Sequence, residues 1–120
     1  MVGATHNAQF LVLEHRYYGD SQPFDEWTVD NMQYLNSELA LADLAYFLET
    51  INTNDVPILV IGGSYPGALS AWFRSRYPHI AIGSWASSAV VQPLVDYWNY
   101  DEQIYQSTLK SGEWCPQAVQ

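Results

Sequence analysis

Basic residues are scarce in this chain of 120 residues. Four Lys and Arg stand against 13 Asp and Glu, which gives a formal net charge of −9 at pH 7. Binding to the phosphates of nucleic acids requires clustered Lys and Arg side chains. We therefore expect no nucleic-acid partner, and the acidity bears on solubility more than on function.

Metal-binding clusters and long apolar runs are also missing. A single cysteine and three scattered histidines give no ligand spacing for a metal, and neither the P-loop nor the dinucleotide fingerprint is present. We therefore expect no metal and no cofactor. No run approaches the roughly 18 apolar residues that span a bilayer, and the first residues lack the basic start and apolar core of a signal peptide. Cys115 is a lone thiol or, in a secreted protein, half of a disulfide with a partner elsewhere.

Apolar periodicity predicts an alternation of strands and helices. Strands are expected at residues 9–14, up to Ile61 and at 80–86, with helices at 37–51 and 66–77. This β-α-β-α-β order is typical of a parallel sheet that helices cover on both faces. Because three such strands would leave apolar edges in water, the chain is predicted to be part of a larger fold.

Both predicted helices have recognisable signals. In the first, Asn36 or Ser37 can cap the start, the next residues break the helix after 51, and an apolar stripe recurs at three- and four-residue steps at Leu41, Leu44, Leu48 and Ile51. In the second, Pro78 ends the helix. Arg74 and Arg76 near that end oppose the helix dipole, which is a structural rather than a ligand-binding role.

The most informative stretch is an apolar run that stops at two glycines and a serine, PILVIGGSYPG at residues 57–67. This is the layout of a nucleophile elbow, in which Ser64 sits on a tight turn between a strand and a helix. Such a turn needs small neighbours, a demand that Gly62 and Gly63 meet. Pro66 stands where the pattern has its last glycine, but it is tolerable in the first helical turn. It leaves in place the backbone N–H of Tyr65, the expected oxyanion donor.

Two other interpretations of these glycines exist. A bare hexapeptide of this kind is more often a glycine-rich turn, because short motifs match by chance. A phosphate-binding loop is disfavoured, since no Lys-Ser or Lys-Thr pair follows at the required spacing. The order of strand, turn and helix around Ser64 favours the elbow.

Several further motifs carry a family resemblance along almost the whole chain. They are LVLEHRYYGDSQPF at residues 11–24, YLNSELALAD at 34–43, GGSY at 62–65, YPH at 77–79 and GSWASSA at 83–89, followed by the stretch from Asp96 to Cys115. Together they closely resemble the serine peptidase family that includes lysosomal Pro-X carboxypeptidase, dipeptidyl peptidase II and thymus-specific serine protease. The last stretch is most similar to the thymus-specific branch. The sequence departs from the family pattern at Pro66 and at residues 90–93.

The resemblance implies an α/β class fold, namely a fragment of an α/β-hydrolase with a helical cap. Residues 1–93 would be part of the core and residues 94–120 the beginning of the cap, where an amphipathic helix is expected. Ser64 would be the nucleophile, with the Tyr65 N–H in the oxyanion hole. Tyr17 and Tyr18 are assigned to the substrate side, and His15 is expected to be a loop-packing or substrate-side residue. The triad Asp and His are expected after residue 120, and a second oxyanion donor before residue 1.

Local residues do not replace the missing triad members. His79 follows the helix and is expected at the wrong end of the sheet, while His15 is expected about 9 to 10 Å of sheet away from the nucleophile's strand. His6 has no context that favours chemistry. Glu14 and Asp20 have no positioned imidazole to orient. Arg16 is expected to pair with a carboxylate that the sequence does not identify, and Asp43 to be solvated or capping.

The implied function is a serine exopeptidase that cleaves peptides next to proline or small residues, as a Pro-X carboxypeptidase or a dipeptidyl peptidase. This chain alone is expected to be inactive or nearly so, because a serine without its base is a weak nucleophile. The alternatives are an esterase or lipase on the same fold and a non-catalytic, peptide-binding relative. The resemblance further implies a peptide substrate, a lysosomal, vacuolar or secreted location, and a disulfide between Cys115 and a cysteine outside this chain.

Overall fold

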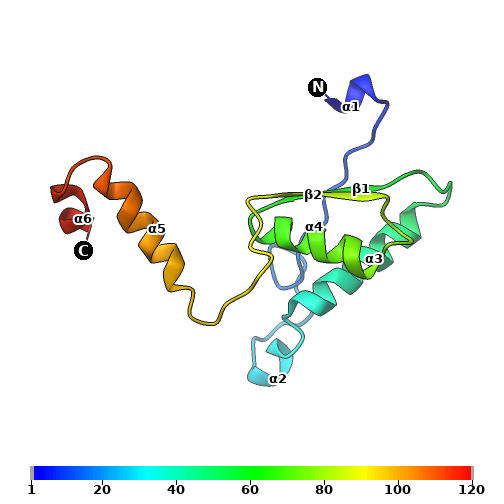
Figure 1. Ribbon diagram of the computed structural model, residues 1–120. Coiled ribbons are helices and arrows are strands. Elements are labelled where there is room, and N and C mark those ends of the chain that lie inside the picture. Colours follow the sequence, from blue (N-terminus) through cyan, green and yellow to red (C-terminus); the bar gives the residue numbers. More distant parts are fainter. Residues whose placement is uncertain (1, 120) are drawn as a thin grey trace. The chain divides into compact units, whose positions relative to one another are not determined.

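The chain divides into two compact units, Met1–Ala89 and Val90–Gln120. The structure, a computed structural model, describes residues 2–119. The first unit contains, in order, α1 (Val2–Thr5), α2 (Val29–Met32), α3 (Ser37–Ile51), β1 (Leu59–Gly63), α4 (Tyr65–Arg76) and β2 (Gly83–Ser87) (Figure 1). The second contains α5 (Trp98–Leu109) and α6 (Trp114–Val119).

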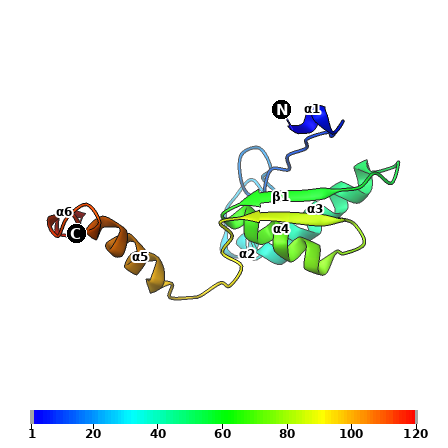
Figure 2. The ribbon, with the colours of Figure 1, turned by 45° about the horizontal axis from the view of Figure 1, so that its top comes forward.

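A small parallel sheet lies at the centre of the first unit. β1 and β2 pair in parallel, in a register that runs from Leu59 opposite Gly83 to Gly63 opposite Ser87. α4 connects the two strands and lies against them, with α3 beyond it on the same side (Figures 1 and 2). The predicted α/β class is therefore confirmed as a β-α-β unit with parallel strands.

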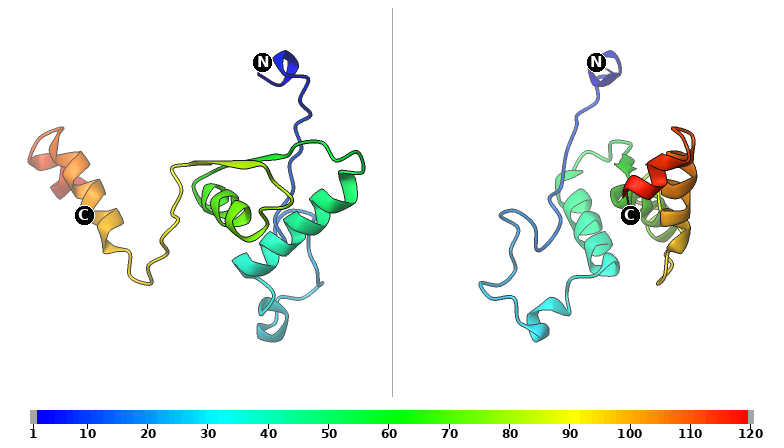
Figure 3. Two further views of the ribbon diagram at one scale, coloured as in Figure 1. Left: turned by 45° about the vertical axis from the view of Figure 1, so that its right-hand side comes forward. Right: turned by 90° about the vertical axis from the view of Figure 1, so that its left-hand side faces the viewer.

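Among the described residues of the first unit, helices cover one face of this sheet, whereas the sequence pattern predicted helices on both faces. The core lies between α3, α4 and the nearer sheet face, and Figure 3 (left) shows α4 directly beneath the strands; its buried members are Leu41, Ala45, Leu48, Phe73 and Ala81. On the opposite face, Ile61 and Trp85 are 55% and 64% exposed. Alternate strand residues point to opposite faces, so the half-buried Val60 lies toward the helices while its neighbours do not.

The prediction of a strand at residues 9–14 is wrong, since the structure describes these residues and shows no strand there. The segment is irregular, and the described sheet has two strands only. Phe10 and Val12 are exposed. An apolar run forms a strand only where a neighbouring strand accepts its hydrogen bonds, and no described strand pairs with these residues.

The expected helix at residues 37–51 is confirmed with its bounds as α3. Asn36 is the N-cap, and its side chain accepts a hydrogen bond from the N–H of Leu39 at 2.9 Å. At the other end, the side chain of Asn52 bonds to both backbone groups of Val56, at 2.9 and 3.0 Å, and closes the turn. The predicted stripe is buried at Leu41 and Leu48, whereas Ile51 is exposed.

The remaining bounds of the first unit are shifted by a few residues. β1 continues to Gly63, α4 runs from Tyr65 to Arg76, and β2 begins at Gly83. The N–H of Ile80 bonds to the carbonyl of Tyr77 at 3.1 Å, so the residues before β2 form the turn that follows α4. Burial of Ala81 in the core fixes that turn, and local propensity does not reveal it.

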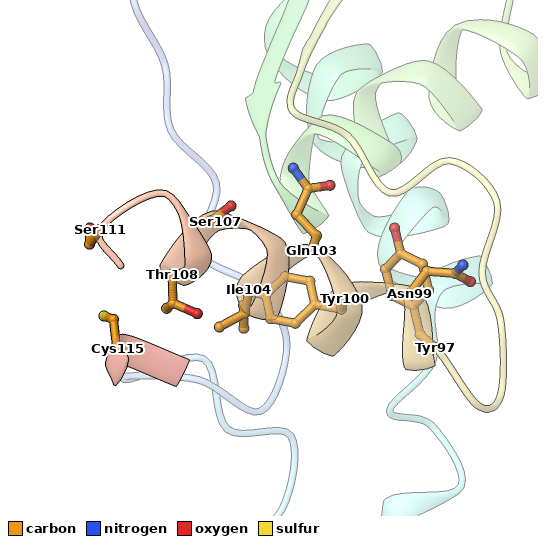
Figure 4. A pocket seen from close by; sticks show the side chains of 9 residues that line it. All are labelled: Tyr97, Asn99, Tyr100, Gln103, Ile104, Ser107, Thr108, Ser111 and Cys115. Atoms are coloured by element: carbon orange, nitrogen blue, oxygen red, sulfur yellow. The ribbon is translucent and has the colours of Figure 1, made fainter. Parts of the chain in front are cut away.

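The second unit is a pair of helices, α5 and α6, that contact each other. The expected amphipathic helix is present from Trp98 to Leu109, and none of its residues is buried. Between the helices lies an open groove of about 550 Å³, lined by aromatic and small polar side chains with the free thiol of Cys115 at one end (Figure 4). Across residues 2–119, no helix has the length and apolar content to cross a bilayer.

Candidate active site

Ser64 is a one-residue turn between β1 and α4. Its backbone has φ +59° and ψ −124°, a conformation that non-glycine residues rarely adopt and that costs about 1–3 kcal/mol. Two hydrogen bonds hold it: its N–H donates to the Ser87 carbonyl at 2.9 Å, and its carbonyl accepts from the Ala68 N–H at 3.1 Å. The side chain is exposed and makes no capping hydrogen bond to the helix. The strain therefore presents a hydroxyl group to solvent.

Glycines make the turn possible by close approach of backbone to backbone. A Cβ on Gly62 would lie 2.0 Å from the carbonyl oxygen of Pro66. A Cβ on Gly67 would lie 2.8 Å from the carbonyl oxygen of Ser87. For Gly63 the nearest atom is 4.0 Å away. The small residues that the turn requires are thus Gly62 and Gly67. Gly67 lies one position after the last glycine of the usual pattern, where this chain has Pro66. Gly63 is not sterically required.

Pro66 fits because it lies in the first turn of α4. Backbone N–H groups at the start of a helix have no partner within the helix, so the missing N–H of proline costs no hydrogen bond there. The N–H of Tyr65 also lies in the first turn of α4, and it donates no hydrogen bond to any group among the described residues. A donor directly after Ser64 is therefore available.

A buried hydroxyl that the sequence did not single out ties the helix to the sheet. Ser70 is 1% exposed, and its Oγ lies 2.8 Å from the carbonyl oxygen of Gly67 and 3.3 Å from that of Trp85. Because a buried polar group must find a partner, these bonds fix the distance between α4 and β2. A serine in an otherwise apolar helix stretch was the only available signal.

The loop at residues 14–22 is closed by its own side chains. Glu14 accepts a hydrogen bond from the backbone N–H of Ser21 at 2.9 Å. Hydrogen bonding from the Ser21 side chain, and to a smaller extent from backbone N–H groups, lowers the pKa of this carboxyl group below its ordinary value of 4.5. The resulting stabilisation is present above that value and is lost as the pH falls through the lowered pKa. Gly19 has φ +51°, and a Cβ there would lie 1.9 Å from the Glu14 carboxylate. A larger residue at this position would be strained by the positive φ and would displace the Glu14 carboxylate.

The three residues assigned to the substrate side occupy different environments. Tyr17 is 5% exposed, and its hydroxyl donates to the carbonyl of Asn31, which gives it a packing role. Tyr18 is 60% exposed and packs edge-on against the His15 ring, at 5.4 Å between centroids. His15 also contacts Tyr65, with 5.8 Å between ring centroids and 3.3 Å from Nε2 to the hydroxyl. The loop thus reaches the residue that follows Ser64.

Comparison with known proteins identifies the family of this chain. The family model described as "Serine carboxypeptidase S28" matches residues 2–120. The chain belongs to this family. The resemblance read from the sequence motifs is thereby confirmed.

Individual relatives are similar over nearly the whole chain. A probable serine protease of Arabidopsis thaliana is 44% identical over 94% of this chain and 25% of its own length. The lysosomal Pro-X carboxypeptidase of Mus musculus is 37% identical over 93% of the chain and 25% of its own length. A probable extracellular serine carboxypeptidase of Arthroderma benhamiae is 39% identical over 80% of the chain and 15% of its own length. The chain spans about a quarter of the first two relatives.

In this serine carboxypeptidase family member, the carboxylate partner of Arg16 is Asp43. The guanidinium Nε and Nη2 atoms bond to the two Asp43 carboxylate oxygens at 2.6 and 2.7 Å, and Nη1 donates to the Tyr34 carbonyl at 3.0 Å. The hydrogen bonds to Asp43 raise the pKa of Arg16. Asp43 was expected to be solvated or capping, and the structure instead makes it an ion-pair partner in a groove of about 450 Å³.

The Arg16–Asp43 pair is expected to stabilise the fold more than a second, more exposed pair does. Arg16→Lys keeps the charge but loses the two-pronged geometry, so the free energy of unfolding should fall by about 1–2 kcal/mol. The control is Arg76→Lys, because Arg76 bonds to Glu38 at 2.6 Å with both side chains more than half exposed; here we expect about 0–0.5 kcal/mol. Urea unfolding of both variants measures the difference, and equal losses would contradict the prediction.

The remaining titratable candidates do not form a catalytic or metal-binding group with Ser64 in the described part of the chain. His79 lies beyond the last turn of α4, 3.9 Å from Glu49. Within residues 2–119, no group of three or more His, Cys, Asp or Glu side chains is placed to hold a metal ion. Ser64 and Tyr65 are therefore the main candidates for a functional site; His15 contacts Tyr65, and Tyr18 contacts His15.

Proposed function

We propose that the complete polypeptide carrying this chain is a serine exopeptidase of the α/β-hydrolase fold, with Ser64 as its nucleophile. The observation that carries the proposal is the strained turn at φ +59°, which exposes the Ser64 hydroxyl at the junction of a strand and a helix. A strained residue that its surroundings hold in place is a recurrent feature of catalytic sites. Membership of a serine carboxypeptidase family supports the same chemistry.

The proposed reaction is acyl transfer in two steps. Ser64 Oγ attacks the carbonyl carbon of the scissile peptide bond while a histidine takes its proton, and the resulting oxyanion accepts a hydrogen bond from the Tyr65 N–H. The C–N bond then breaks, and the histidine returns the proton to the leaving amine. Water hydrolyses the acyl-serine ester in the second step. The triad Asp and His are proposed to follow residue 120, because hydrolases of this fold order them after the serine.

Proline-adjacent cleavage from the carboxyl end is the specific activity that we propose. The support is that relatives in three mammals are described as lysosomal Pro-X carboxypeptidases. Tyr18 is the residue that we propose for the substrate side, and His15 is a packing residue that contacts both Tyr18 and Tyr65. Residues 1–93 are proposed as part of the hydrolase core and residues 94–120 as the start of its cap.

A carboxypeptidase must also recognise the free carboxylate of its substrate. Arg16 does not serve, since its charge is paired with Asp43 and three of its five N–H donors bond to Asp43 and the Tyr34 carbonyl. Arg74 and Arg76 lie in the last turn of α4, which is 12 residues long, so about 15 to 18 Å along the helix axis separates their backbones from Ser64. We therefore propose that a group other than these three arginines binds the substrate carboxylate.

A lysosomal or secreted location is proposed for the whole protein, supported by one relative described as lysosomal and another as extracellular. Such a compartment permits disulfides. Cys115 carries a free thiol in this chain. We propose that it pairs with a cysteine elsewhere in the complete polypeptide, which mass spectrometry of non-reduced peptides would detect.

The test uses the complete polypeptide and two assays. A fluorophosphonate probe should label Ser64, as located by mass spectrometry, while the 120-residue chain alone should be labelled far more slowly because it lacks the base. Peptides with proline before the last residue should be cleaved, and the same peptides with an amidated carboxyl end should not. Ester cleavage without peptide cleavage would favour an esterase, and an unlabelled Ser64 would indicate a non-catalytic relative.

A further inference from the structure

The hydroxyl group of Tyr65 lies between two polar side chains from other parts of the first unit. It is 3.0 Å from Ser37 Oγ and 3.3 Å from His15 Nε2. Ser37 is the first residue of α3, and His15 belongs to the loop at residues 14–22. Tyr65 itself is the first residue of α4 and directly follows Ser64. Three separate segments thus meet at one hydroxyl group beside the strained turn.

The partners of His15 assign a direction to these hydrogen bonds. His15 Nδ1 is 2.7 Å from the Arg16 carbonyl oxygen, which can only accept, so Nδ1 carries a hydrogen. In the neutral ring, Nε2 is then an acceptor. With the ring neutral, the Tyr65 hydroxyl donates to His15 Nε2, and the Ser37 hydroxyl donates to the Tyr65 oxygen. In this arrangement, the Tyr65 hydroxyl group donates one hydrogen bond and accepts one.

The two partners are themselves held in place. Asn36, next to Ser37, caps α3 through the N–H of Leu39. Arg16, next to His15, forms its two hydrogen bonds with Asp43 of α3. The loop and the helix that bond to the Tyr65 hydroxyl are therefore bonded to each other, so together they form one support for that hydroxyl group.

Such a support meets a need of this turn. A residue stays at a strained backbone conformation only where its surroundings fix it, and Ser64 makes no side-chain cap to α4. The residue after Tyr65 is Pro66, which has no N–H to anchor the helix start. Tyr65 is 41% exposed, so apolar packing alone leaves it partly unheld. The two hydrogen bonds of its hydroxyl group therefore help to fix Tyr65, whose backbone N–H is the proposed oxyanion donor.

We propose that Ser37 and His15 are positioning residues of the peptidase reaction, because they hold Tyr65 and thereby fix the Ser64–Tyr65 turn. The inference rests on the proposed function, in which the Tyr65 N–H stabilises the oxyanion. Misplacement of that donor weakens an interaction made mainly in the transition state. The expected effect is thus on kcat and not on KM.

The test compares variants of the complete polypeptide, with rates divided by the titrated active-site concentration. Tyr65→Phe removes the hydroxyl and should lower kcat about 10- to 100-fold, with KM changed by less than about two-fold. His15→Phe and Ser37→Ala should each lower kcat by part of that factor. His15→Gln and Ser37→Thr, which keep an acceptor and a hydroxyl, should restore most of it. The control is Tyr46→Phe, on the exposed side of α3, with no expected change.

Two further measurements separate positioning from other roles. If the hydroxyl bonds act as one support, adding His15→Phe to Tyr65→Phe should lower kcat no further. Hydrogen exchange in the segment around residues 62–69 should be faster in Tyr65→Phe than in the wild type and unchanged in Tyr46→Phe. Hydrogen exchange can be measured whether or not the protein is catalytically active.

The outcomes distinguish this inference from the function beneath it. An active, Ser64-labelled wild type whose Tyr65→Phe variant keeps its kcat overturns the positioning role. A raised KM with unchanged kcat also overturns it and makes the hydroxyl a substrate contact. A wild type that is not labelled at Ser64 overturns the proposed function and with it the role in catalysis, and hydrogen exchange still decides whether the hydroxyl holds the turn.

Discussion

Replacing Ser64 by alanine in the complete polypeptide is expected to lower kcat by about 10⁴- to 10⁶-fold, because the nucleophile of a serine peptidase has no substitute. Stability should hardly change. The Ser64 side chain makes no capping bond, and alanine keeps the N–H and carbonyl that bond to Ser87 and Ala68. Steady-state kinetics and thermal unfolding of the same sample measure both effects.

The matched control for this change is Ser75→Ala. Ser75 is an exposed serine in α4, near the end of the helix opposite to Ser64. We expect wild-type rates from it. Peptide cleavage by Ser64→Ala at more than about a hundredth of the wild-type rate would refute the assignment of the nucleophile.

The second large effect is expected for Gly62→Ala. The new Cβ would lie 2.0 Å from the Pro66 carbonyl oxygen and 2.2 Å from its carbonyl carbon, and neither backbone atom can rotate away. The strand and helix would have to separate, which breaks the contact on which the turn depends. The free energy of unfolding should fall by about 3 kcal/mol or more. Urea unfolding, or loss of soluble protein, measures this.

Gly63→Ala is the matched control, since it adds the same methyl group one residue later. The nearest atom to that Cβ is 4.0 Å away, an ordinary contact. We expect a change within about 0.5 kcal/mol. Similar losses for the two glycines would mean that the close approach at Gly62 does not control the turn.

Local patterns predicted the elements that depend on their own residues. The capping residue Asn36, the leucine stripe and the breaking residues after it were sufficient to give α3 with its bounds. The glycines and Ser64 predicted the position of the turn, because they stand between an apolar strand pattern and a helix pattern, in the order that such a junction needs. Pro66 in the first helical turn followed from its missing N–H.

Interactions between distant segments were not predictable in the same way. Residues 9–14 have the composition of a strand, but pairing requires a neighbour that composition cannot name. The expected sheet separation kept His15 away from the Ser64 turn, whereas its loop folds so that the ring reaches the Tyr65 hydroxyl. The choice of Asp43 for Arg16 likewise needed the loop and α3 to be placed in three dimensions.

The sequence by itself determined the family, the α/β order of the central elements and the serine at the turn, because each of these is recorded in neighbouring residues or in motifs. Tertiary structure alone decided that one sheet face is covered by helices, that Gly67 takes the role of the missing glycine, and that Tyr65 is held by Ser37 and His15. The physical reason is that these features depend on distances between segments, and a packed chain fixes such distances only when all of its parts are in place.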